Sequence, residues 1–440
     1  MSRLSLILRS AGIMAIAFAG IASVLGRNGQ QTVGGKPNPC YYGSQACSPC
    51  HFLETPFPDN PETPPLCRGI ERLIWQNHDK HSDAFKNLNG PLGKQMSRIL
   101  GRDAATDAKC LACHVGKFEE RGRQQSFKLT EGVSCGTCHG MHDDWIQLHS
   151  SRKPEWRSLS RREKELRYGM IDLWDPVRRM EVCASCHVGD GKDRFVTHEM
   201  YAAGHPPLPG IEAATFARSM PAHWENLSDK NPRVRKLLGY TEGEAEQTRH
   251  VVLTGPVALR ESARLVIAQA NACVQSAGGA ALDYANFDCY ACHHELKNPG
   301  WRQARGYKGK PGRPQMRPWP TALTEAALAF LGDERPAQTL DTALMPLFEA
   351  FSAQPFGDCP RVAREARGVA DWGDRLIARL EKQKFDQAAC TRYLRALCSS
   401  AESIRDFDSA RQLTWAFESV YAEVKPKPAN DAQIRAVLGQ

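Results

Sequence analysis

The sequence predicts a mainly α-helical protein in two parts, short helices and loops first and longer helices after them. Three observations favour this fold class. The pattern Cys-x-x-Cys-His occurs five times between residues 47 and 293. A Gly-Pro pair followed by apolar residues predicts a helix over 256–272, because Pro is tolerated in the first turn. After residue 320, apolar residues recur at amphipathic helical spacing.

The five motifs lie at residues 47–51, 110–114, 135–139, 183–187 and 289–293, and we number them first to fifth. This pattern is the attachment signal of a c-type haem, since two thiols at that spacing form thioethers to one porphyrin and the histidine binds its iron. A zinc site or a redox disulfide would not place a histidine directly after the second cysteine each time. The sequence therefore predicts five covalently bound haem c groups. Their cysteines are Cys47, Cys50, Cys110, Cys113, Cys135, Cys138, Cys183, Cys186, Cys289 and Cys292, and their proximal ligands are His51, His114, His139, His187 and His293.

We divide the chain accordingly. Residues 40–296 are predicted to form a multihaem cytochrome c fold, with short helices and loops around stacked haems. Only 25 residues separate the starts of the second and third motifs, so we expect those two to be neighbours. Residues 297–320 form a basic Gly/Pro-rich connector, and 321–440 an α-helical C-terminal domain. Within that domain Pro346 interrupts an apolar run, so a helix is expected to kink or begin near it.

The N-terminus places the protein outside the cytoplasm. Residues 1–26 carry basic residues followed by an uncharged run, the pattern of a signal peptide or of a membrane anchor, and 27–39 are a linker. Both alternatives predict a periplasmic or otherwise extracytoplasmic protein, and the second also predicts membrane association. The formal charge of +8 does not indicate nucleic-acid binding. The propionates of the haems offset it, and no nucleic-acid motif is present.

The remaining histidines decide the chemistry, because a haem with two protein ligands carries electrons and one with an open position can transform a substrate. Nine histidines lie outside the proximal positions. His78 and His81 would share a helical face, so only one of them is expected to reach an iron. His198 and His205 are seven residues apart, about two helical turns. Our candidates for distal ligands are His81, His149, His198 and His205.

Residues 41–47 (Tyr-Tyr-Gly-Ser-Gln-Ala-Cys), the segment from Trp75 to His81, and 132–140 (Gly-Val-Ser-Cys-Gly-Thr-Cys-His-Gly) resemble the cytochrome c-554 family. This family of tetrahaem electron carriers is related to the hydroxylamine oxidoreductase superfamily. The resemblance covers about 40–205. It implies that His81 serves the fourth motif, that His149 serves the first, and that His198 or His205 serves the third. It also implies that the haem on His114 can lack a distal ligand.

The chain departs from that family by its fifth motif and its helical tail. For the fifth haem, the remaining member of the His198/His205 pair is the candidate ligand. The connector is expected either to pair with haem propionates or to dock an acidic redox partner.

Six cysteines lie outside the motifs, and an oxidising compartment favours disulfides between them. On one helix, Cys390 and Cys398 would be about 12 Å apart, too far for a bridge. We therefore expect Cys359 to pair with one of them and Cys40 with Cys67. Isolated buried thiols are the alternative.

The leading functional prediction is an extracytoplasmic pentahaem cytochrome that carries electrons between redox partner proteins through mostly bis-His haems. The alternative is a multihaem oxidoreductase that acts on a small nitrogen or sulfur species at one five-coordinate haem. A third hypothesis is a subunit of a membrane-associated complex, in which the helical tail binds the partner.

Overall fold

The computed structural model describes residues 40–58, 60, 64–141, 143–150, 154–276, 281–304, 310, 312–404 and 406–438, and it is mainly α-helical, as predicted. Its α-helices are α1 (Ser48–His51), α2 (Glu71–His78), α3 (Ala84–Leu88), α4 (Pro91–Leu100), α5 (Ala108–His114), α6 (Cys135–His139), α7 (Asp143–Ser150), α8 (Pro154–Ser158), α9 (Arg161–Tyr168), α10 (Pro176–His187), α11 (His198–Ala202), α12 (Ala213–Ser219), α13 (Pro232–Leu237), α14 (Glu246–Gln275), α15 (Trp301–Ala304), α16 (Trp319–Phe330), α17 (Pro336–Ser352), α18 (Cys359–Leu380), α19 (Gln387–Ala401), α20 (Phe407–Glu423) and α21 (Asp431–Leu438). Shorter 3₁₀ turns lie at η1 (Ser44–Cys47), η2 (Lys80–Asp83), η3 (Glu120–Gly122), η4 (Leu129–Glu131), η5 (Leu227–Asp229), η6 (Tyr284–Asn286) and η7 (Cys289–Ala291).

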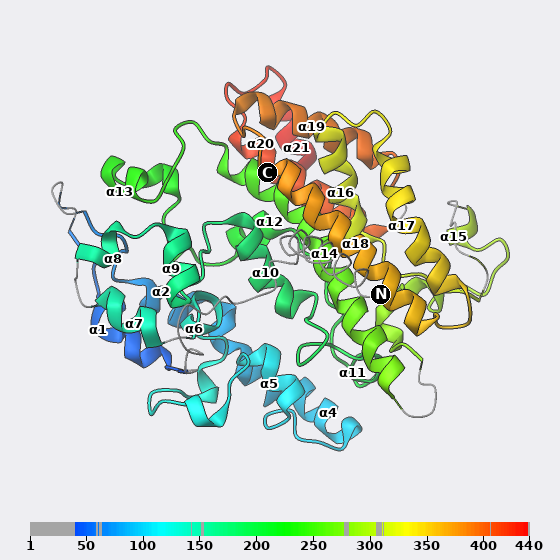
Figure 1. Ribbon diagram of the computed structural model, residues 1–440, viewed down its shortest axis with the longest axis horizontal. Helices are drawn as coiled ribbons and strands as arrows, with labels where there is room; N and C mark the ends of the chain where they lie inside the picture. Colours follow the sequence, from blue (N-terminus) through cyan, green and yellow to red (C-terminus); the bar gives the residue numbers. More distant parts are fainter. Residues whose placement is uncertain are drawn as a thin grey trace, which may run out of the picture.

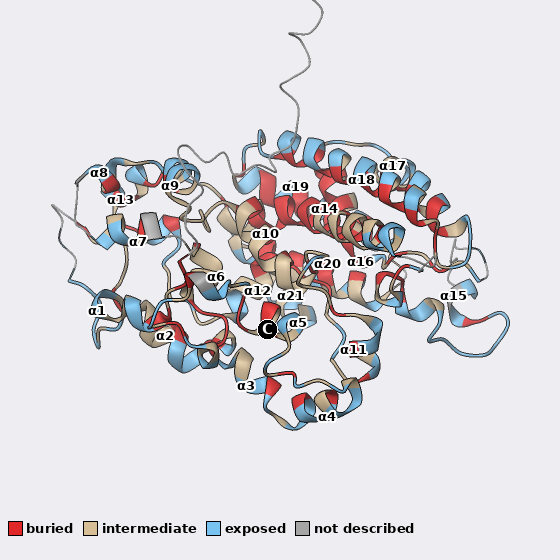
Figure 2. Ribbon diagram, turned by 60° about the horizontal axis from the view of Figure 1, so that its bottom comes forward, coloured by how far each residue is buried: buried red, intermediate tan, exposed pale blue. Residues whose placement is uncertain are grey.

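The molecule has two differently built regions (Figure 1). The short helices α1 to α9 are joined by long loops on one side, and the long helices α14 and α16 to α20 pack against one another on the other side. Figure 2 shows buried residues concentrated on α14, α18 and α19, whereas α1 to α9 are largely half-buried or exposed. The main apolar core therefore lies in the long helices, and α10 and α12 join it through their contacts with α14.

Helix α14 is the central element of this core. Its middle is apolar on every side, with Val251, Val252, Leu253, Val257 and Leu259 fully buried. A helix that is apolar all round is stable only when other elements cover all its faces. Helices α10, α16, α18 and α20 provide that cover.

The expected helix over 256–272 is longer than predicted. Helix α14 begins at Glu246, so Gly255 and Pro256 lie inside it rather than at its start. The glycine serves close packing. A Cβ there would lie 2.5 Å from the Cβ of Leu323, so its absence lets α16 approach.

Three helices of the C-terminal part begin at aspartate caps. Asp358, Asp386 and Asp406 each accept a hydrogen bond from a backbone N–H three residues later, at the starts of α18, α19 and α20. The apolar run around Pro346 is helical, as expected, but of the two alternatives a helix start there is wrong, because α17 begins at Pro336 and continues through Pro346 to Ser352.

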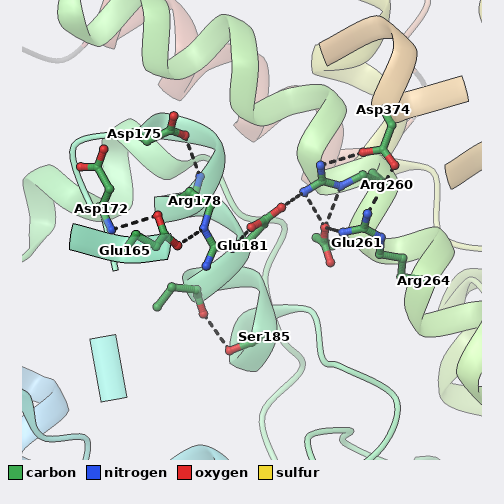
Figure 3. A network of polar contacts seen from close by, with 11 residues as sticks. Glu165, Asp172, Asp175, Arg178, Glu181, Ser185, Arg260, Glu261, Arg264 and Asp374 are labelled. Carbon is green, nitrogen blue, oxygen red and sulfur yellow. Dashed lines mark hydrogen bonds and ion pairs between the residues drawn. The ribbon is translucent and has the colours of Figure 1, made fainter. Parts of the chain in front are cut away.

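A network of charged side chains connects the two regions (Figure 3). The guanidinium of Arg260 in α14 is buried and bonds to Asp374 of α18 at 2.9 Å and to Glu181 of α10 at 2.5 Å. Arg178 contacts Glu181 as well, and it bonds to Glu165 of α9 at 2.6 Å. Because Glu181 lies two residues before Cys183, the network reaches the helix that carries the fourth motif.

The disulfide predictions are wrong. Cys359 bonds to Cys273, which joins the end of α14 to the start of α18. Cys390 and Cys398 do lie on one helix, α19, and both are free, as are Cys40 and Cys67. Cys273 and Cys359 are 86 residues apart and are brought together by the packing of α14 on α18, which sequence spacing does not indicate.

Among the described helices, none is long and apolar enough to cross a membrane. The predicted signal peptide or anchor at 1–26 and the linker at 27–39 lie outside the described residues.

Candidate haem-binding site

One large cavity brings four of the five motifs together. It has a volume of about 2130 Å³ and is lined by every cysteine and histidine of the first four motifs. A typical small-molecule pocket occupies about 300–1,000 Å³, so this space suits several large cofactors rather than one ligand. The fifth motif is not part of its lining.

The first four motifs have the same local structure. Helices α1, α5, α6 and α10 each end at the histidine of a motif. Residues three and four apart lie on one face of a helix, so the helical turn directs both thiols and the imidazole toward one side. The fifth motif differs, because η7 (Cys289–Ala291) is a 3₁₀ turn that ends before His293.

Three pairs of imidazole rings face each other in this cavity. The ring centroids of His51 and His149 are 6.2 Å apart, with an interplanar angle of 20°. Those of His187 and His81 are 6.3 Å apart at 88°. His139 and His223 are 6.4 Å apart at 71°.

This spacing tests whether the site fits a haem iron. Two imidazoles that bind one metal ion from opposite sides, each at about 2 Å, bring their ring centroids about 6 Å apart. All three pairs have that separation, and each pair contains the histidine of a Cys-x-x-Cys-His motif. The residues present therefore fit a haem with two axial imidazoles at the first, third and fourth motifs.

His223 was not among the predicted ligands. It lies in the irregular segment between α12 and η5, where no helical spacing marks it, and its ring packs against Trp224. Neither His198 nor His205 is the ring beside His139, so the structure differs from the expected ligand of the third motif. The sequence offered one indication of His223, namely that the histidine of the third motif needs a second histidine if its haem is to have two axial ligands.

His198 and His205, whose spacing corresponds to two helical turns, do not share a helix. Helix α11 stops at Ala202, after His198 and before His205. His205 lines the cavity, and its pKa is lowered by burial and by the nearby charge of His114. His198 lies outside the cavity lining and packs against Tyr284, in the segment that leads to the fifth motif.

His78 and His81, which were expected to share a helical face, are also separated by a helix end. Helix α2 ends at His78, which is exposed, and His81 follows in the turn η2. A buried aspartate, Asp79, separates the two histidines and accepts a hydrogen bond from the backbone N–H of His81. His142 lies outside the described residues.

Contacts between motifs give the order of the sites in the cavity. A hydrogen bond with Cys135 of the third motif lowers the pKa of Cys47 in the first to about 7. A hydrogen bond with Cys113 of the second motif lowers the pKa of Cys186 in the fourth to about 6. These contacts place the first motif beside the third and the second beside the fourth.

Two further contacts centre on the third motif. The hydroxyl of Thr137 donates a 3.1 Å hydrogen bond to the carbonyl of Val115, which directly follows the second motif, so the expected proximity of these motifs is observed. Burial raises the pKa of Cys138, and the nearby Cys183 and Cys186 of the fourth motif raise it further. The third motif thus neighbours the other three.

Burial keeps most of these imidazoles neutral, the form that binds metal. It lowers the pKa of His139 and of His187 to about 4 each. His51 and His81 are different, because hydrogen bonds with Cys67 and Glu71 raise the pKa of His51 to about 10 and a hydrogen bond with Asp79 raises the pKa of His81. The side chains of His51, Cys67 and Glu71 could themselves hold an ion, since their ligand atoms lie within 4.8 Å of one another, but they overlap the first motif through His51.

The fifth motif lies at the surface. Cys289 and Cys292 are exposed, and so are Tyr290 and His293. The segment is tied to the connector, because the backbone N–H of Asp288 donates to the carbonyl of Gln315 and Phe287 forms an isolated bridge with Met316. This motif is therefore positioned by the contact with residues 315–316 rather than by the cavity.

Comparison with known proteins adds one finding. Residues 46–140 match the family model described as cytochrome c554 and c-prime. The match supports a c-type cytochrome. Covalent haem c and a role in electron transfer belong to such a cytochrome, and c-type cytochromes are usually extracytoplasmic. No curated protein and no solved structure matches this chain.

Proposed function

We propose that this c-type cytochrome is an extracytoplasmic electron carrier with five haem c groups, four of them in the shared cavity. The carrying observation is the three imidazole pairs at 6.2 to 6.4 Å. Such a pair leaves an iron no open position, and haem c then supplies a one-electron couple and no substrate site.

The residues that would hold the cofactors follow from the cavity. The ten motif cysteines would form the thioethers, and the five motif histidines would be the proximal ligands. His149, His223 and His81 would be the distal ligands of the first, third and fourth sites. His205 is the candidate for the second site because it lines the cavity near His114.

His198 is the candidate for the fifth site. Its backbone N–H donates a 2.9 Å hydrogen bond to Asp283, six residues before Cys289. The exposed fifth motif, followed by the basic connector, suits exchange of electrons with an acidic redox partner protein at the surface. Membrane association would come from residues 1–26.

Low-temperature electron paramagnetic resonance (EPR) of the ferric holoprotein tests the carrier function. We expect low-spin signals that do not change when nitric oxide or cyanide is added. A high-spin signal that responds to these ligands would contradict the proposal and favour the oxidoreductase, which binds a nitrogen or sulfur species at an open haem.

His223→Ala tests the ligand set. We expect it to convert one low-spin signal into a high-spin signal that binds nitric oxide, because the site on His139 then has one imidazole. His78→Ala is the matched control, since His78 is exposed at the end of α2 and pairs with no motif histidine. Equal spectra for the two variants would exclude His223 as a ligand.

A further inference from the structure

The imidazoles in the cavity differ in what their Nδ1 atoms bond to. In the first pair, Nδ1 of His51 donates to the Glu71 carboxylate at 2.9 Å. In the pair of the fourth motif, Nδ1 of His81 donates to the Asp79 carboxylate at 2.9 Å, and that aspartate is buried. Each carboxylate is held by a second hydrogen bond from a backbone N–H, that of Arg68 for Glu71 and that of His81 for Asp79.

The other imidazoles have weaker acceptors. Nδ1 of His114 bonds to the carbonyl of Ala84, that of His149 to the carbonyl of Ile146, and that of His205 to the carbonyl of Pro206, each at 2.8 Å. Among the described residues, no carboxylate hydrogen-bonds to the third pair. Nδ1 of His223 is buried without a regular hydrogen bond, and only the backbone of Pro221 interacts with this ring as an acceptor. In the part of the chain that the structure describes, the third pair thus has the weakest hydrogen-bond acceptors.

We propose that Glu71 and Asp79 are positioning residues that lower the reduction potentials of the first and fourth haem sites, so that the third site is the first to be reduced. This inference rests on the proposed electron-carrier function. A carboxylate that accepts the Nδ1 proton makes an imidazole more basic, and a more basic ligand stabilises ferric over ferrous iron.

The position of the third site suits the proposed order of reduction potentials to electron transfer between the sites. Its motif contacts the first through Cys135, the second through Thr137, and the fourth through the neighbourhood of Cys138. The site that holds an electron best therefore lies one contact away from each of the other three in the cavity. The second site, with two backbone carbonyl acceptors, falls between the third and the carboxylate-bonded sites.

The ring angles allow the sites to be told apart by EPR. Nearly parallel axial imidazoles, as in the first pair at 20°, give a rhombic low-spin spectrum. Nearly perpendicular rings, as in the third pair at 71° and the pair of the fourth motif at 88°, give low-spin signals with a large maximal g value. A redox titration followed by EPR thus reports the first site separately from the other two.

The test is such a titration of the holoprotein and of Glu71→Gln and Asp79→Asn. We expect the rhombic component of Glu71→Gln to be reduced at a higher potential than in the wild type, with a smaller upward change of the third site, because the charge of Glu71 also acts on His139 and His223. For Asp79→Asn, one large-g component should move up. A smaller upward change of the third site should accompany it, because the charge of Asp79 also acts on His223.

Matched control variants separate the effect of the hydrogen bond at Nδ1 from the effect of a nearby negative charge. Glu131 lies near Cys47 and accepts a 2.8 Å hydrogen bond from the backbone N–H of Ser44, but it does not bond to an imidazole. Glu131→Gln therefore removes a charge at the first site and leaves Nδ1 of His51 bonded. Asp83→Asn, at an exposed ion pair with Lys86, is the control for Asp79.

The outcomes of the titration distinguish failure of this inference from failure of the carrier function on which it rests. Changes of potential in Glu71→Gln and Asp79→Asn no larger than in the controls would overturn the inference while the carrier function stands. If a variant does not mature, the wild-type titration decides. Loss first of the large-g component that His223→Ala abolishes supports the inference, and loss first of the other large-g component or of the rhombic component overturns it. Absence of all these low-spin signals in the wild type would instead overturn the proposed function.

Discussion

Glu212 is a single residue whose charge conflicts with its surroundings. It is 1% exposed at the start of α12, where its carboxylate accepts hydrogen bonds from the backbone N–H groups of Ala214 and Thr215. Burial raises its pKa, and these hydrogen bonds only partly offset that rise. The folded state therefore favours the protonated acid more than the unfolded state does.

The contribution of Glu212 to the free energy of unfolding therefore depends on pH, and the raised pKa gives the sign of this dependence. The contribution of Glu212 to stability is fully present below its unfolded pKa of about 4.3 and is lost as pH rises through its higher folded pKa. Glu212→Gln, which stays neutral, should gain stability relative to the wild type as pH rises from about 4 to about 8, by on the order of 1 kcal/mol. Urea unfolding followed by circular dichroism measures the difference in the free energy of unfolding.

Glu381→Gln is the control for this experiment, because Glu381 is exposed. Its stability curve should run parallel to that of the wild type over the same pH range. Parallel curves for the wild type and Glu212→Gln would contradict the expectation.

The residues of the site could be predicted from sequence only where a local pattern marks them. The five motifs are explicit, and the resemblance pointed to His81 and His149, which the structure brings beside His187 and His51. His223 could not be found in this way, because it lies in an irregular segment 84 residues after His139. It reaches the third motif because the chain folds back to the cavity, and no periodic pattern in the sequence predicts this contact.

At the scale of elements, α10, α14 and α18 are held together by buried charge as well as by apolar contacts. Arg260 is 4% exposed and bonds to carboxylates of three residues, Glu181, Glu261 and Asp374. Removing one partner of a buried ion pair leaves the others uncompensated, which costs about 3–5 kcal/mol. The alignment of α10 with α14 and α18 should therefore depend on this one side chain.

Arg260→Met tests this dependence. We expect the free energy of unfolding to fall by about 3 kcal/mol in urea titrations, because three carboxylates lose their shared partner. Arg264→Met is the matched control, one turn further along α14, where a more exposed arginine pairs with Glu261 and Asp374. Its loss should cost less than about 1 kcal/mol. Equal losses in the two variants would contradict a special role for Arg260.

The sequence predicted helices in the C-terminal part because their buried faces repeat at helical spacing. It misplaced the start of α14 and left open a start of α17 at Pro346, because proline inside a helix resembles proline at its start. For α14, the packing of Gly255 against Leu323 shows that this glycine serves a contact inside the helix rather than a helix start. That packing partner is 68 residues away, so no local pattern could indicate it.

At the scale of the whole molecule, the two regions are stabilised by different means. The long helices share one large apolar core with residues 177–184 and 211–214, whereas the other buried apolar residues in the described part of 41–238 form small clusters, and this region surrounds a cavity of about 2130 Å³. Ordering the backbone costs about 1–2 kcal/mol per residue, and burial of apolar surface must offset it. Without porphyrins the apolar lining of the cavity would face water, so the short-helix region needs its cofactors to fold.

Chain produced without haem attachment should therefore be folded in one region only. We expect limited proteolysis to cut first within 40–170 and to spare 246–438, because the latter residues contain no part of the first four motifs and include most of the large core. Mass spectrometry of the fragments locates the cuts, and the holoprotein is the control. Cuts spread evenly over both regions, or protection of 40–170, would contradict the expectation.

The disulfide between Cys273 and Cys359 also has a consequence for how the protein is made. It closes a loop that contains the fifth motif, so a chain that oxidises at random can trap Cys289 or Cys292 with the wrong partner. Thioether formation needs reduced thiols, whereas the bridge needs oxidised ones. With five haems, the sixteen cysteines must reach three fates: ten in thioethers, two in one bridge and four left free. Maturation thus requires a thiol reductant and an oxidant acting on the same chain, in a controlled order.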